Sequence, residues 1–380
     1  MENMVEDIAG TFEDAFKGKT VLVTGHTGFK GSWLSIWLKE LGANVVGYSL
    51  DPPTQPSNFE VTNLQQKIIS IKGDVRDFAK LNETIQNHRP AIIFHLAAQP
   101  IILTGLKEPK LTFETNVIGT LNILESARNS PFIKAVVSIT SDKCYKNQEL
   151  LWGYRENDLL GGDDPYSGSK AMAELLIESY QKSFFRKNKD IAAVASVRAG
   201  NVIGGGDFAD FRLVPDCMKA LMEKQPIIIR NPNSVRPWQH VLVPLSGYLW
   251  TAVNLMKDKN KFSEGWNFGP PEHKGVPAKE LAENLIKLWG GGSWVNASQN
   301  TDKVETNLLR LNWEKAAYYQ GWHPVYSIKE SLKETVEWFK SFQEYRKNSA
   351  SVDMYNVCLK QISSYTKMAR DHEMSWAVKK

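Results

Sequence analysis

Strand-like and helix-like segments alternate through the first half of the chain, and this alternation limits the possible folds more than any other feature of the sequence. Short runs rich in Val, Ile and Ala are each followed by a stretch with helical apolar spacing. Parallel strands need such crossovers, which cover both faces of the sheet. The sequence therefore predicts an α/β fold with a doubly wound parallel sheet. The expected strands are 20–25, 44–50, 68–75, 91–98, 134–141 and 191–202, and the expected helices are 32–42, 77–88, 111–129 and 167–185.

Three glycines, Gly25, Gly28 and Gly31, separate the first expected strand from the first expected helix. In such a turn the first glycine permits the bend, the second lets the backbone approach a pyrophosphate, and the third lets the helix pack against the strand. Free N–H groups at the helix N-terminus then bind the phosphates. A plain glycine-rich turn is the alternative. The residues that follow the later strands favour a Rossmann-type dinucleotide site.

Asp51 follows the second strand at the distance at which an acid holds the adenosine ribose, and Asp74, at the end of the third strand, is expected near the adenine. A carboxylate at Asp51 repels a 2′-phosphate, so NAD is favoured over NADP. Lys30 and His26 are the counter-argument because either is long enough to reach a phosphate, but we interpret Lys30 as a solvated turn residue. The residues assigned to the cofactor site are Gly25, Thr27, Gly28, Phe29, Lys30, Gly31, Asp51, Asp74, Val75, Leu96, Ala97, Ala98, Gln99, Asn116, Tyr166, Lys170 and Arg198.

Tyr166 and Lys170 are spaced i to i+4 at the start of an expected helix, so their side chains lie on one helix face. A nearby ammonium and a positive nicotinamide ring lower the pKa of a phenol, which can then take a proton from an alcohol while hydride leaves the same carbon. Ser141, at the end of the preceding strand, is placed to bind the reacting oxygen. Asn116 is expected either to help hold the lysine or to be an ordinary polar helix residue.

Asp142 and Lys143 follow directly, at the carboxyl end of a central strand where ligands bind in open α/β sheets. A surface ion pair is the alternative. Beyond about residue 203, Gly and Pro become dense and the helical patterns shorten, while 241–256 resembles a buried strand leading into a helix. We therefore expect an N-terminal extension (1–17), an NAD-binding domain (18–202), a smaller mixed α/β substrate-binding region (203–350) and a C-terminal polar helix or tail (351–380).

Composition excludes several classes of protein. The net charge of +4 over 380 residues gives no basic stripe for nucleic acid, and no apolar run is long enough for a membrane span. Three scattered cysteines fit neither a disulfide framework nor a zinc site, so no metal is expected. The acidic start "MENMVEDIAG" lacks the cationic region of a signal peptide. We expect a cytoplasmic protein.

Several phrases of the chain resemble the CDP-glucose 4,6-dehydratases, a branch of the extended short-chain dehydrogenase/reductase family that serves bacterial deoxysugar pathways. They include "GHTGFKGSWLS", "TSDKCY", "GGDDPYSGSK", "SVRAGNVIGGGDF" and "NPNSVRPWQHVL". The resemblance runs from about residue 18 to 345. Related sugar-nucleotide dehydratases carry Asp-Glu where this chain has Asp142–Lys143. The chain differs from the family pattern at "IILTGL" (101–106, with Leu103), at Val243 and at "KVET" (303–306). These differences affect the expected identity of the hexose or nucleotide more than they affect the expected type of reaction.

The resemblance implies a redox-neutral reaction on CDP-glucose or a related nucleotide sugar. Tyr166 would remove the 4-OH proton during oxidation at C4, Lys143 would remove H5, and Asp142 would protonate the departing 6-OH. The last two steps need a neutral Lys143 and a protonated Asp142, states that a closed, poorly solvated pocket favours. The residues that the resemblance assigns to substrate are Ser141, Asn201, Arg212, Val214, Arg236, Gln239 and His240.

The family also implies a homodimer, or a dimer of dimers, joined through the helices expected at 111–129 and 167–185. Two other functions remain open from the residues. A sugar-nucleotide 4-epimerase or reductase needs Tyr166 and Lys170 but not the pair at 142–143. A non-catalytic sugar-nucleotide-binding protein needs none of the four.

Overall fold

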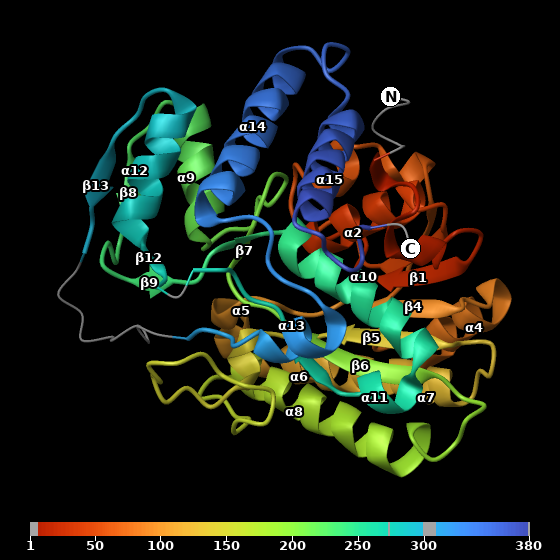
Figure 1. Ribbon diagram of the computed structural model, residues 1–380. Coiled ribbons are helices and arrows are strands. Elements are labelled where there is room, and N and C mark those ends of the chain that lie inside the picture. Colours follow the sequence, from red (N-terminus) through yellow and green to blue (C-terminus); the bar gives the residue numbers. More distant parts are fainter. Residues whose placement is uncertain (1–6, 273, 299–308, 379–380) are drawn as a thin grey trace.

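A seven-stranded parallel sheet forms the centre of the computed structural model, which describes residues 7–272, 274–298 and 309–378 (Figure 1). The strand order, β11-β6-β5-β4-β1-β2-β3, is that of a doubly wound Rossmann-type sheet, so the predicted fold class is confirmed. The strands are β1 (Thr20–Thr24), β2 (Asn44–Ser49), β3 (Ile69–Lys72), β4 (Ile92–His95), β5 (Ala135–Ile139), β6 (Ala193–Arg198) and β11 (Gly265–Asn267).

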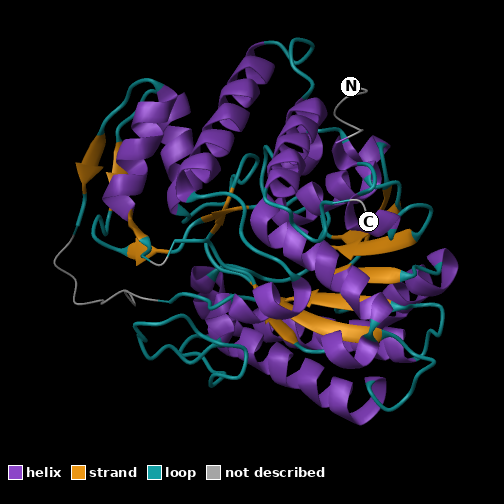
Figure 2. Cartoon of the chain, viewed as in Figure 1, coloured by secondary structure: helices purple, strands orange, loops and turns teal. Residues whose placement is uncertain are grey.

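Helices cover both faces of this sheet because successive strand residues point to opposite sides (Figure 2). Leu22, Val136 and Val194 face the layer of α4 (Phe78–His88), α7 (Gly119–Arg128) and α8 (Pro165–Tyr180). Their neighbours in each strand face α2 (Phe29–Glu40) and α10 (Leu242–Lys257). The apolar residues at the middle of the sheet therefore lie in one of two cores, and most of the chemistry is left to the strand ends.

Two expected long helices contain π-helical turns. The helix expected at 111–129 comprises α6 (Pro109–Phe113), a π turn (η3, Glu114–Ile118) and α7, and α8 continues into a second π turn (η5, Gln181–Phe185). π turns occur often at functional positions, and the first of these contains Asn116.

The strand expected at the start of 241–256 is wrong, because α10 is helical from Leu242 to Lys257. Almost every residue of α10 is buried, and a helix that is apolar all round shows no helical period in its sequence.

A smaller mixed region lies beside the sheet, on the left in Figure 1, and is built from α9, α12 and α14 with short strand pairs. The pairs are β10 with β7, β12 with β9, and β13 with β8. The bounds are β7 (Val202–Ile203), α9 (Leu213–Met222), β8 (Ile227–Ile229), β9 (Val235–Arg236), β10 (Gln239–His240), β12 (Val276–Pro277), α12 (Ala278–Trp289), β13 (Trp294–Asn296) and α14 (Ile328–Lys347). The shorter helices are η1 (Thr11–Asp14), α3 (Asn58–Val61), η2 (Leu64–Gln66), α5 (Ile102–Lys107), η4 (Asp142–Cys144), α11 (Lys259–Phe262) and α13 (Glu314–Gln320).

The last helix, α15 (Met354–Asp371), is not a solvated tail. It packs along α2, and its buried face includes Cys358, Ile362 and Tyr365. Phe12 stacks on Trp376 with 4.8 Å between ring centroids, and both rings contact Trp37 of α2. Segments from near both chain ends therefore pack against the helix that follows the glycine turn.

Within the described ranges, no helix is long and apolar enough to cross a membrane, and no group of His, Cys, Asp and Glu is arranged to hold a metal ion. The departure at 303–306 lies outside the described residues.

Candidate functional site

The glycine turn has the geometry that a dinucleotide requires. Gly25 has φ of 75°, and a Cβ there would lie 2.8 Å from the backbone N of Ala97. A Cβ at Gly31 would lie 2.1 Å from the carbonyl O of Gly25, so only glycine lets α2 start this close to the strand. Gly28 is the N-cap of α2, and no side chain caps the helix there. The first N–H groups of α2 are therefore open to an anion.

Two carboxylates lie beyond the turn. Asp51 is mostly exposed and pairs with Lys72 at 2.5 Å, whereas Asp74 receives a bidentate contact from Arg76, at 2.9 and 2.6 Å. The Arg76 hydrogen bond lowers the pKa of Asp74. Thr27 Oγ1 bonds Ser49 Oγ at 2.8 Å and so joins the turn to the end of β2. Val75 packs under Gly119, where a Cβ would lie 2.7 Å from its methyl group.

The two basic residues of the turn differ from expectation. Lys30 is partly buried, and burial lowers the pKa of its ammonium to about 8, assisted by Arg212 and Lys170 and opposed by Asp142 and Asp207. The interpretation of Lys30 as a solvated residue is therefore wrong. His26 points the other way: its Nε2 bonds Ser70 Oγ at 2.7 Å, and burial lowers its pKa to about 4. Lys30 rather than His26 is the turn cation that faces the other charged candidates.

Asn116 connects the end of β4 to the helix of Tyr166. Its Oδ1 accepts from the Gln99 N–H at 2.8 Å, and its Nδ2 donates to Ser169 Oγ at 2.8 Å. The Gln99 side chain donates to Thr112 at 2.8 Å. Asn116 thus holds the Gln99 backbone, directly after Leu96, Ala97 and Ala98, beside α8, and its side-chain bonds go to Gln99 and Ser169 rather than to Lys170.

Tyr166 and Lys170 lie on one face of α8 and are both buried. Burial raises the pKa of Tyr166 to about 12, and a hydrogen bond with Ser141 opposes the rise. The cation that lowers the Tyr166 pKa is Arg212 rather than the predicted Lys170. Burial lowers the pKa of Lys170 to about 8, with Glu174 opposing, and its Nζ donates to the Ile139 carbonyl at 3.4 Å.

Ser141 connects this pair to Asp142. Its hydroxyl donates to Asp142 Oδ1 at 2.9 Å and accepts from the Lys143 N–H at 3.2 Å. The other carboxylate oxygen of Asp142 is buried, has no hydrogen-bond partner among the described residues and lies over Gly200. An unpartnered buried carboxylate oxygen marks a place where a substrate group can supply the missing hydrogen bond.

Tyr248, on α10, is a neighbour of this cluster that the sequence analysis missed. Its hydroxyl is buried and has no hydrogen-bond partner within the part of the chain that the structure describes. Burial together with the charges of Asp142 and Tyr166 raises its pKa. It lies in a long apolar run, where a single tyrosine gives no signal.

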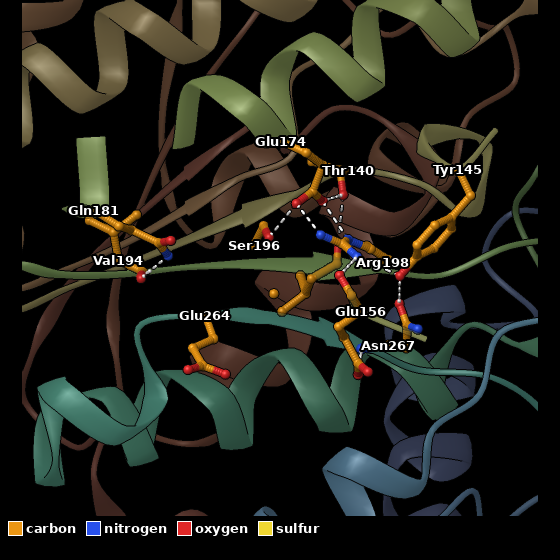
Figure 3. Close-up of polar contacts among 12 residues, drawn as sticks. Thr140, Tyr145, Glu156, Glu174, Gln181, Val194, Ser196, Arg198, Glu264 and Asn267 are labelled. Atoms are coloured by element: carbon orange, nitrogen blue, oxygen red, sulfur yellow. Dashed lines mark hydrogen bonds and ion pairs between the residues drawn. The ribbon is translucent and has the colours of Figure 1, made fainter. Parts of the chain in front are cut away.

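Arg198 has a different position from the one predicted. Its guanidinium bonds Glu174 through Nε at 2.9 Å and Nη2 at 2.6 Å, while Nη1 donates to Tyr145 and to the Glu156 carbonyl (Figure 3). Both members of the ion pair are buried. Because its donors are used inside the protein, assignment of Arg198 to the cofactor site is a wrong prediction.

Three residues predicted to contact substrate are also interior. His240 is fully buried between Trp33 and Tyr326, and burial lowers its pKa to about 3. Gln239 donates to the carbonyls of Gly200 and Phe268, at 3.1 Å each. Val214 packs in the core. The side chains of His240 and Val214 offer no surface to a nucleotide, which contradicts the prediction for both.

Arg212 remains at the site. Its Nη1 pairs with the buried Asp207 at 2.9 Å, and the charges of Lys30 and Tyr166 interact with it. Asn201 is partly buried with φ of 45°, and its carbonyl accepts from the Gln239 N–H at 3.2 Å. Arg236 lies further out on β9 and is also partly buried. Leu103 is 44% exposed on α5, whereas Val243 is fully buried in α10.

Solved structures similar to this chain have the same fold. UDP-glucose 4-epimerase from Thermotoga maritima, solved with UDP-glucose, has a TM-score of 0.73 at 23% identity, over 85% of this chain and 99% of that one. dTDP-glucose 4,6-dehydratase from Bacillus anthracis, solved in complex with NAD, has a TM-score of 0.69 at 23% identity, over 89% of this chain and all of that one.

A relative found by comparison of sequences is more similar to this chain than either of these structures. A CDP-glucose 4,6-dehydratase from Salmonella typhimurium is 49% identical over 331 residues, which are 86% of this chain and 92% of that protein. The model of the GDP-mannose 4,6-dehydratase family matches residues 22–254, from β1 to α10. The chain therefore belongs to this family of sugar-nucleotide dehydratases within the extended short-chain dehydrogenase/reductases.

Proposed function

We propose that this protein is an NAD-dependent CDP-glucose 4,6-dehydratase, a hydro-lyase that forms CDP-4-keto-6-deoxy-D-glucose. The 49% identity to the Salmonella enzyme over most of both chains supports the reaction and the nucleotide. The observation that carries the chemistry is the buried Ser141 hydroxyl, which bonds Asp142 and also influences the pKa of Tyr166. One hydroxyl therefore joins the residue proposed for oxidation to a residue proposed for elimination.

The residues around the glycine turn fit the cofactor. The uncapped N-terminus of α2 suits a pyrophosphate, and the Asp51 carboxylate suits an unphosphorylated ribose. NAD⁺ held there by these residues would supply the acceptor for a hydride from C4 and the donor of that hydride to C6. The partly buried Lys30 adds a positive charge on the anion-binding side of the site.

Protons move through the chain's own residues. Tyr166 takes the proton of the sugar 4-OH as C4 is oxidised, and the resulting ketone acidifies H5. Lys143 removes H5, and Asp142 protonates the 6-OH, which leaves as water. A solvent-derived proton returns to C5, so the sugar gains a 4-ketone and a 6-methyl group with no net oxidation.

We assign the diphosphates to the cations Lys30 and Arg212. Arg212, fixed by Asp207, is the best-placed guanidinium for the substrate diphosphate because it also interacts with Tyr166. Asn201 and Arg236 complete the proposed nucleotide-binding side. Lys72 beside Asp51 reduces the repulsion of a 2′-phosphate, so a comparison of NAD⁺ with NADP⁺ tests the cofactor preference directly.

The deciding test is competition among nucleotide sugars. CDP-, UDP-, dTDP- and GDP-glucose are offered at equal concentration without added NADH, and 4-keto product is measured. A site built to accept from the cytosine amino group disfavours other bases by roughly 10- to 150-fold. A preference for another nucleotide removes the CDP assignment but leaves the dehydratase. Interconversion of 4-epimers without loss of water favours the epimerase alternative, and binding without turnover favours a binding protein.

A homodimer, or a dimer of dimers, is proposed for the assembly. Apolar side chains are exposed on the helices expected to pair, namely Ile118 (43%), Met172 (48%) and Leu175 (54%). Met172→Glu with Leu175→Glu is expected to lower the mass in solution to that of the monomer. Ile228→Glu, at an exposed position on β8, is the control.

We place the activity in cytoplasmic deoxysugar synthesis of the kind that supplies lipopolysaccharide O-antigen. The three free cysteines support this setting.

A further inference from the structure

We infer that the buried ion pair between Glu174 and Arg198 positions the elimination residues relative to the oxidation residues. Specifically, the pair holds segment 140–145, which contains Ser141, Asp142 and Lys143, against the helix of Tyr166 and Lys170. Glu174 and Arg198 touch no reacting atom in this proposal, so they are positioning residues. The expected effects on the reaction rates rest on the proposed function. The expected loosening of segment 140–145 can be tested without turnover.

The ion pair is well satisfied. Glu174 is on α8 and Arg198 on β6, and their side chains are 3% and 5% exposed. Two hydrogen bonds join them in a fork, at 2.9 and 2.6 Å, and Ser196 Oγ adds a third bond to Glu174 at 2.7 Å. A buried pair contributes little net stability compared with apolar residues of the same volume, although removal of one partner is strongly destabilising. Packing alone therefore does not explain why charges occupy this place.

Hydrogen bonds join the Glu174–Arg198 pair to both ends of segment 140–145 (Figure 3). Thr140 Oγ1 donates to Glu174 Oε1, and Arg198 Nη1 donates to Tyr145 Oη. Tyr145 in turn donates to Asn267 of β11 at 2.9 Å. The residues between Thr140 and Tyr145 are those proposed for elimination, so the hydrogen bonds at these two positions fix where the elimination residues lie.

The same carboxylate fixes the segment to the oxidation pair. Tyr166, Lys170 and Glu174 are spaced by four residues on α8, so they form one stripe along the helix. Glu174 also raises the pKa of Lys170 against the effect of burial. A shift of the segment along α8 would separate Asp142 and Lys143 from a sugar whose 4-OH is held at Tyr166.

Peripheral variants test the inference without leaving a buried charge unpaired. Thr140→Val removes the hydrogen bond at one end of segment 140–145 and Tyr145→Phe the one at the other end, with the ion pair intact. Small misplacements of reacting groups reduce rates by up to about 100-fold. We expect both variants to slow elimination roughly 10- to 100-fold while C4 oxidation changes less than about 3-fold. The readouts with CDP-glucose are accumulation of NADH absorbance and slowed incorporation of solvent deuterium at C5.

Ser196→Ala is the matched control. It removes an equally buried hydroxyl from the same Glu174 carboxylate, but that hydroxyl comes from β6 rather than from segment 140–145. It should leave the ratio of elimination to oxidation unchanged, and Thr140→Ser should restore the wild-type ratio. Equal loss of both steps in Thr140→Val, or the same change in Ser196→Ala, overturns the inference.

Cys144 provides a readout that needs no turnover. It is fully buried within the segment, and burial raises its thiol pKa. Labelling by a maleimide, resolved by peptide mass spectrometry, should accelerate at Cys144 in Thr140→Val and Tyr145→Phe but not in Ser196→Ala. Cys217 and Cys358, also buried, are internal references. Unchanged Cys144 labelling overturns the inference. Absence of 4-keto product from the wild-type enzyme counts against the proposed function alone.

Discussion

Asp142 lies directly over Gly200, so closely that a Cβ at position 200 would be 2.2 Å from its Oδ2. The obstructed atoms are the end of a side chain rather than backbone, so Gly200→Ala is expected to fold and to displace the carboxylate. Elimination should slow roughly 10- to 100-fold because the proposed acid is misplaced. The measurement is 4-keto formation by Gly200→Ala, Asp142→Ala and the double variant. The glycine substitution should add little once Asp142 is gone; additive losses would disprove the relationship.

Tyr166→Phe is expected to lose C4 oxidation while retaining the cofactor. The change removes the proposed base, and loss of a general base costs at least about 100-fold. The rate of NADH appearance after mixing with CDP-glucose measures the step, and nucleotide released on denaturation measures retention. Near-normal turnover in this variant would exclude Tyr166 as the base.

Lys143→Met should separate the two halves of the reaction. Oxidation at C4 remains possible because Tyr166, Lys170 and Ser141 are untouched, whereas H5 loses its proposed base. Reduced cofactor is then expected to accumulate, with little deuterium entering C5 from heavy water. If the variant dehydrates at the wild-type rate, Lys143 has a structural role only.

Ser141→Ala should move the pH dependence of oxidation to higher pH. A hydrogen bond donated by Ser141 to the Tyr166 oxygen, in place of the bond to Asp142, opposes the effect of burial on Tyr166, whose pKa is raised to about 12. Without that bond the pKa rises further, and a smaller fraction of the phenol is ionised at any pH below it. The pH profile of NADH appearance is the measurement. A profile that keeps its position while only its height falls would contradict this account.

Lys30→Met is expected to stabilise the protein without ligand and to weaken its binding of nucleotides. Burial lowers the Lys30 pKa from 10.5 to about 8, so the unfolded chain binds this proton more tightly than the folded one. The destabilisation is complete below about pH 8 and disappears near pH 10.5. The gain in Tm of Lys30→Met should follow that pH range, and its affinity for NAD⁺ or CDP-glucose should fall. A variant that binds both nucleotides normally would place Lys30 outside the anion site.

The fold was predictable because each strand and crossover has its own local pattern. Periodicity failed at α10, whose residues are apolar on every side. Side-chain direction was harder to predict than position. Arg198 is the last residue of β6, and Ser196 and Arg198, two residues apart, point to the same face of that strand and both bind Glu174. The interior position of His240 could not be predicted because the rings that pack against it, Trp33 and Tyr326, are distant in sequence. Lys30 could not be assigned for the same reason, since Arg212 and Asp207 lie far along the chain.

The packing of Phe12, Tyr365 and Trp376 around Trp37 has a consequence for biosynthesis. The helix that follows the glycine turn is translated early, but part of its apolar surface is covered by residues that leave the ribosome much later. Until they emerge, the face of Trp37 that packs against Tyr365 and Trp376 has no apolar cover on the nascent chain. The nucleotide-binding half of the protein therefore matures after translation of the α15 segment rather than during its own synthesis.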